Sequence, residues 1–123
     1  MTQQVEAVDQ ELMQKIISAK DGSERKFKTF TGSFYILKSA LRYFSIKKGM
    51  SFTSSKIADN FPVSAPVAGS SLKILAELDV VEPRTSSSSP NRYMPENVDL
   101  ERMEQIQEIL IENFEIKEFK PED

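Results

Sequence analysis

The chain has 123 residues, of which 39% are hydrophobic and 28% are charged, an ordinary composition for one globular domain with a modest core. It has no cysteine and no histidine, which excludes disulfides, thiol chemistry, imidazole acid–base catalysis and the usual zinc ligands. No apolar run is long enough to span a membrane, and residues 1–10 lack the pattern of a signal peptide, so we expect a cytoplasmic protein.

The net charge of −3 conceals an uneven distribution along the chain. Residues 1–24 carry two Lys against five acidic residues, and residues 95–123 carry three Lys and Arg against ten. Residues 25–94 carry eleven Lys and Arg against four acidic residues, a surplus of seven positive charges. Such a surplus attracts phosphate groups even in an acidic protein, although the charges can also be distributed for solubility alone.

The N-terminal part predicts two amphipathic helices. Residues 3–19 place apolar residues at spacings of three and four, which forms one apolar stripe on a helix. Residues 23–31 are basic and alternate weakly around two phenylalanines, which indicates a short strand or an extended linker. A second helix is predicted over 33–45, with Ser33 as its N-cap.

The middle of the chain predicts a short helix, a tight turn and a longer helix. The short helix covers about 54–60 with Thr53 as N-cap, and residues 61–63 form the turn because a residue before proline is pushed out of helical geometry. The longer helix covers 66–78, with Ser64 or Ala65 as its N-cap, and begins with a proline, which suits a first helical turn. Val80-Val81 then begins a short strand that continues to Arg84, residues 85–91 form a Ser-rich loop, and residues 92–94 form the returning strand.

The C-terminal part predicts one more amphipathic helix over 99–116, with Asp99 as N-cap. The apolar stripes of this helix and of the first helix can cover the core or join two copies of the chain. Because two such helices exceed what a core of about sixty residues needs, we expect a homodimer through one or both. The candidate dimerisation residues are Val5, Val8, Leu12, Ile16, Leu100, Met103, Ile106, Leu110 and Phe114.

No arrangement of residues in the sequence indicates catalysis. The glycines do not form a phosphate-binding loop, and acidic residues are dense only from Glu96 onward, where they form one exposed helical ridge. We therefore expect no enzyme activity, no metal and no cofactor, and no small-molecule ligand is evident.

A set of residues in the middle of the chain follows the pattern of a known family. It consists of Ile57 and Ala58 on the short helix, Ser64 before the longer one, Leu72, Leu75 and Leu78 along it, and Asp79-Val80-Val81 after it. Residues 33–94 thus resemble the winged-helix family of transcription regulators, in which glycine often stands where this chain has Asp79. The resemblance implies a mainly α fold with a small β-hairpin, an α+β class. The winged helix-turn-helix domain would cover 23–95, with an N-terminal helix over 1–22 and an acidic helix and tail over 96–123.

The resemblance also implies a small dimeric regulator that binds double-stranded DNA. Helix 66–78 would enter the major groove, while the wing over 82–94 and nearby cations would contact the phosphates. The candidate DNA-binding residues are Lys47, Lys48, Ser54, Ser55, Lys56, Ala65, Pro66, Gly69, Ser70, Lys73, Arg84 and Arg92. Base readout usually uses Arg, Lys, Asn or Gln, so this helix predicts weak discrimination unless DNA shape and the wing supply it.

Two other functions stay open. The mostly uncharged helix over 66–78 and the acidic last helix also suit a protein–protein interaction module in a larger assembly, including a nucleoprotein assembly. RNA binding by the same fold is a third alternative, against which the acidic ends of the chain argue.

Overall fold

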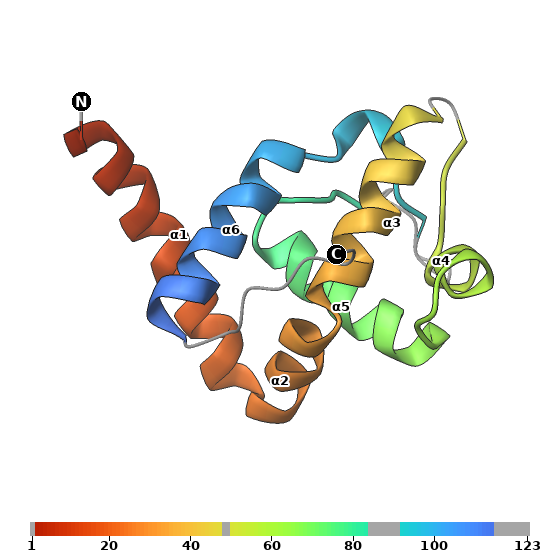
Figure 1. The fold of residues 1–123 in the computed structure, drawn as a ribbon, viewed down its shortest axis with the longest axis horizontal. Coiled ribbons are helices and arrows are strands. Elements are labelled where there is room, and N and C mark those ends of the chain that lie inside the picture. Colours follow the sequence, from red (N-terminus) through yellow and green to blue (C-terminus); the bar gives the residue numbers. More distant parts are fainter. Residues whose placement is uncertain (1, 48–49, 84–91, 115–123) are drawn as a thin grey trace, which may run out of the picture.

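The computed structural model describes residues 2–47, 50–83 and 92–114, and of residues 2–9 only the backbone. Within these ranges the elements are α1 (Thr2–Gly22), α2 (Glu24–Gly32), α3 (Phe34–Ile46), α4 (Ser54–Asn60), α5 (Ala65–Glu77), the 3₁₀-helix η1 (Pro95–Asn97) and α6 (Leu100–Asn113). Figure 1 shows α1 and α6 side by side at one end of the molecule and α4 at the other. Helix α5 lies between α2 and α4 and packs against both.

One hydrophobic core joins the terminal helices to the middle of the chain. Its largest fully buried side chains include Phe30 and Phe34, and it also holds residues of α1 and α6. The Phe30 ring lies 6.0 Å from the Phe27 ring and 5.8 Å from the Phe34 ring, measured between centroids. Aromatic pairs at such separations add to the stability that burial provides. The first and last helices therefore complete the same core as the middle helices.

Three helices begin at the N-caps that the sequence predicts. Each capping side chain accepts a hydrogen bond from the backbone N–H three residues later, at 3.2 Å for Thr53, 3.3 Å for Ser64 and 3.0 Å for Asp99. Such bonds satisfy N–H groups that have no partner inside the helix. Ser33 does precede α3, but it makes no capping bond, because its hydroxyl donates to the carbonyl of Thr29 at 2.7 Å.

The prediction of a strand or linker over 23–31 is wrong, since this segment forms α2. The hydroxyl of Ser23 accepts a hydrogen bond from the backbone N–H of Lys26 at 3.3 Å and caps the helix. Phe27 and Phe30 are both buried. Residues three apart lie on one face of a helix but on opposite faces of a strand, so the helix buries both rings at once.

The predicted α+β fold class with a β-hairpin wing over 82–94 is also wrong. The described ranges contain no strand, and their only β pairing is two isolated antiparallel bridges, from Tyr93 to Phe52 and from Tyr93 to Pro83. Phe52 and Tyr93 exchange two backbone hydrogen bonds of 2.9 Å. The predicted loop at 85–91 lies outside the described residues, as does Arg84 at the end of the first predicted strand.

The backbone of the first predicted arm is already engaged with helix ends. The N–H of Val80 donates to the carbonyl of Leu75 at 2.9 Å, and the carbonyl of Val80 accepts from the N–H of Asp99 at 2.8 Å. Pro83 has no N–H to donate to a ladder. Among the described residues, this arm therefore pairs with the second one only through the bridge from Pro83 to Tyr93.

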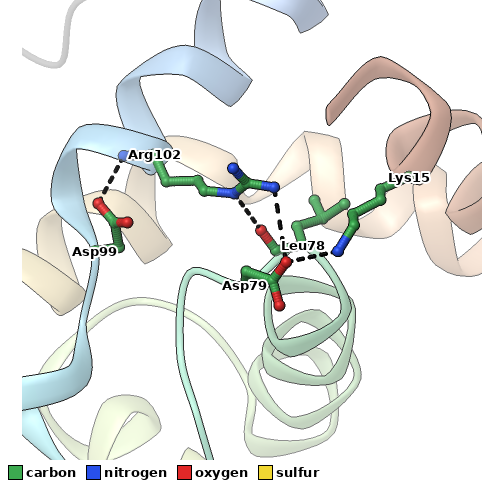
Figure 2. Close-up of polar contacts among 5 residues, drawn as sticks. All are labelled: Lys15, Leu78, Asp79, Asp99 and Arg102. Atoms are coloured by element: carbon green, nitrogen blue, oxygen red, sulfur yellow. Dashed lines mark hydrogen bonds and ion pairs between the residues drawn. The ribbon is translucent and has the colours of Figure 1, made fainter. Parts of the chain in front are cut away.

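Asp79 joins the end of α5 to both terminal helices, as Figure 2 shows. Its φ angle is 68°, in the left-handed region that favours glycine and tolerates aspartate. Its Oδ2 lies 2.6 Å from Nζ of Lys15 and 3.7 Å from Nη2 of Arg102. Arg102 Nε also donates to the carbonyl of Leu78 at 2.8 Å. The turn after α5 is thereby held against α1 and α6.

A pair of substitutions at Asp79 separates backbone conformation from charge. Asp79→Ala and Asp79→Gly remove the same two ion pairs, but only alanine retains a Cβ that is strained at this φ angle. We expect the glycine variant to be more stable than the alanine variant by about 1 kcal/mol in urea unfolding. Equal stabilities would show that the left-handed conformation costs nothing at this position.

Candidate nucleic-acid interface

Helix α5 has a buried face, two flanked sides and a narrow exposed strip. Ala68, Leu72 and Leu75 are buried, whereas Pro66 and Lys73 are exposed. Because α2 and α4 both pack against α5, the exposed strip lies between two other helices. A duplex that approaches α5 would therefore meet α2 and α4 as well.

The predicted DNA-binding residues differ in accessibility. The exposed ones are Lys47, Ser55, Lys56, Pro66, Lys73 and Arg92, and the partly buried ones are Ser54, Ala65, Gly69 and Ser70. Two further candidates, Lys48 and Arg84, lie outside the described residues. Lys47 lies over the ring of Tyr43, with Nζ 4.7 Å from the ring centroid. The exposed residues come from α4, α5 and the segments that flank them, and the partly buried ones lie on α4 and α5.

Gly69 lies where α4 and α5 meet. A Cβ added at Gly69 would be 3.6 Å from the hydroxyl oxygen of Ser54, which is an ordinary contact distance. Gly69→Ala should therefore stabilise the protein by about 0.5–1 kcal/mol in urea unfolding, because alanine is the better helix former. A loss of stability would mean that α4 and α5 approach each other more closely than described here.

A groove of about 540 Å³ lies on the surface where α5 meets the corner between α1 and α2. One wall of the groove includes three of the candidate DNA-binding residues on α5, namely Pro66, Ser70 and Lys73. The other wall includes Lys26 of α2. The surface predicted to read bases thus forms part of a groove and does not stand free. Lys26 was not predicted as a site residue, because its segment was interpreted as a strand or a linker.

The cations of the described residues divide into paired and unpaired groups. Asp79 pairs with Lys15 and Arg102. Oε2 of Glu104 lies 2.9 Å from Nζ of Lys38 and 3.8 Å from Nη2 of Arg42. Lys20 and Lys47 lie over aromatic rings. The described cations with neither kind of contact are Arg25, Lys26, Lys28, Lys56, Lys73 and Arg92. Most of this second group belongs to α2, α4 and α5.

Most of the candidate dimerisation residues contribute to the core of a single chain. Leu12, Ile16, Met103, Ile106 and Leu110 are each at most 1% exposed. Leu100 and Phe114 are partly buried against the same core, and the side chains of Val5 and Val8 are not described. A dimer through the five buried side chains would require the core to open.

Two features of other functional classes are absent from the described part of the chain. It contains no group of three or more acidic residues placed to hold a metal ion. None of its helices is long and apolar enough to cross a membrane.

No protein-family model, no curated protein and no solved structure matches this chain. The β-hairpin that the winged-helix resemblance implied is not formed by the described residues. The function is therefore inferred from the surfaces and charges themselves.

Proposed function

We propose that this chain binds duplex DNA through the face formed by α2, α5 and α4, together with Arg92, whose neighbour Tyr93 pairs with Phe52 just before α4. The distribution of cations carries the proposal. Lys26, Lys56, Lys73 and Arg92 make no ion pair within the described residues, whereas the cations beside α6 are neutralised by Asp79 and Glu104. Unpaired cations lose no existing contact when they bind phosphate, and phosphate contacts supply most of the affinity of sequence-tolerant DNA binding.

This binding would depend more on phosphate contacts than on base contacts. Lys73 and Glu77 are the exposed charged residues of α5, and Glu77 repels phosphates. Ser70 is partly buried and already donates to the carbonyl of Val67 at 3.3 Å. Of these residues, only Lys73 is of a type that reads a guanine edge through two acceptors, so base contacts from α5 are few. We therefore expect a weak sequence preference.

The test is the binding of a random pool of fluorescent duplexes, measured by anisotropy at 50 and 200 mM salt. Four phosphate contacts predict a slope of about −3.6 for the logarithm of affinity against the logarithm of salt concentration. The affinity should then fall by about a hundredfold between the two conditions. If no duplex binding is detected at 50 mM salt, the proposal is wrong.

One observation favours a protein partner as a second candidate. Ile46 is 76% exposed, Met50 54% and Tyr43 43%, and these apolar side chains lie at or shortly after the C-terminal end of α3. Exposed apolar residues that lie close together often mark an interface. This candidate predicts that the tagged protein recovers a stoichiometric protein after nuclease treatment, and that Ile46→Ser abolishes the recovery. Loss of the partner on nuclease treatment would exclude it.

A further inference from the structure

The groove between α5 and the α1–α2 corner has the size of a ligand site. Its volume of about 540 Å³ lies within the range of roughly 300–1,000 Å³ that is typical of pockets for small molecules. One wall is the last turn of α1 and the first turn of α2, and the other is the outer side of α5. Both walls belong to helices that the core holds in place.

Two ammonium groups from separate helices line this groove. Lys26 belongs to α2 and Lys73 to α5, and neither has a carboxylate partner in the described structure. Like charges that line one groove repel each other, and an anion bound between them adds two attractions that offset this repulsion. The partial positive charge at the N-terminal end of α2 is offset on this wall by the C-terminal end of α1 and by Glu24, so the attraction for an anion comes from the two lysines. The groove is therefore suited to an anionic group.

The other lining residues restrict the ligand further. Glu77 lines the same groove, so a ligand with negative charge along its whole length would meet repulsion. Pro66, Ile74 and Ala19 provide apolar surface, and Ser18 provides an exposed hydroxyl. This lining favours a molecule with one anionic end and a largely uncharged body.

We infer that the groove binds a small organic molecule that carries one phosphate group, held between Lys26 and Lys73 and no larger than a nucleotide. The uncharged body of the ligand lies over Ile74 and Pro66. This binding does not depend on the proposed function. It has a consequence for it, because a ligand that occupies Lys26 and Lys73 prevents these residues from contacting DNA.

Calorimetric titration of the full chain with adenosine 5′-monophosphate, adenosine and inorganic phosphate tests the inference. We expect saturable binding of the monophosphate, and binding at least tenfold weaker for adenosine and for phosphate alone. Lys26→Ala and Lys73→Ala should each weaken the monophosphate by about tenfold. Lys28→Ala is the matched control, because Lys28 is also exposed on α2 but lines a different pocket beside Phe114. It should leave the affinity unchanged.

Two results would overturn the inference: no saturable binding of the monophosphate, or an equal loss of affinity in Lys73→Ala and Lys28→Ala. The melting temperature of each variant identifies any loss that is due to unfolding. The same samples are titrated with duplex DNA, which separates the two proposals. Monophosphate binding without DNA binding supports the groove and contradicts the proposed function, and DNA binding alone does the reverse. If both bind, the monophosphate should displace the duplex.

Discussion

Replacing Lys56, Lys73 and Arg92 together by alanine should lower the affinity for duplex DNA by more than a hundredfold at 0.1 M salt. Each phosphate contact contributes about 0.9 to the salt slope, so three lost contacts reduce the slope from about −3.6 to about −1. None of the three side chains makes an ion pair in the described structure, so their removal should leave the fold unchanged. Anisotropy titration at several salt concentrations measures both quantities.

The control removes cations from a different surface. Lys20 and Lys28 line a pocket with Phe114, away from the groove that contains Lys73. The double variant Lys20→Ala, Lys28→Ala should lower DNA affinity less than about fivefold, through net charge alone. If the two sets of substitutions reduce affinity equally per charge, no particular face of the protein binds DNA.

Phe30→Ala should reduce the free energy of unfolding by about 3–5 kcal/mol. Phe30 is 0% exposed, and its ring contacts those of Phe27 and Phe34, so its loss leaves a cavity between α2 and α3. Because small domains are typically stable by only about 5–15 kcal/mol, much of the population could unfold at 37 °C. Urea unfolding followed by circular dichroism measures the change.

A conservative variant identifies the cause of that loss. Phe30→Leu keeps most of the buried volume and should cost clearly less than Phe30→Ala. A loss below about 1 kcal/mol for Phe30→Ala would mean that α2 is not anchored to the core through this ring. The groove beside α2 would then also lack a fixed wall.

Helices with local signals could be predicted from the sequence. Thr53, Ser64 and Asp99 each cap the helix expected after them, and the turn between α4 and α5 follows from Pro62. These features depend on residues within a few positions of one another. Such signals determine where a helix begins regardless of the rest of the fold.

The signal for α2 was present in the sequence but was misinterpreted. Six apolar residues follow one another at spacings of three and four: Phe27, Phe30, Phe34, Leu37, Leu41 and Phe44. This spacing continues from α2 into α3, and all six side chains are buried. Considering residues 23–31 alone concealed the period, because nine residues contain only two of its members. The longer window predicts a helix.

The missing wing and the groove depend on contacts between distant parts of the chain. Val80 is engaged by Leu75 and by Asp99, and the second of these contacts requires α6 to dock nearby. Similarly, Lys26 and Lys73 are 47 positions apart and line one groove only because α2 packs against α5. No local pattern encodes either arrangement.

The central claim is that the face formed by α2, α5 and α4 binds DNA, and an NMR titration of the ¹⁵N-labelled chain with a short duplex tests it most directly. We expect the amide signals of α2, α4 and α5 to shift, including those near Lys26, Lys56 and Lys73, while those of the outer face of α6 do not. Shifts confined to α6 and α1, or no shifts at low salt, would contradict it.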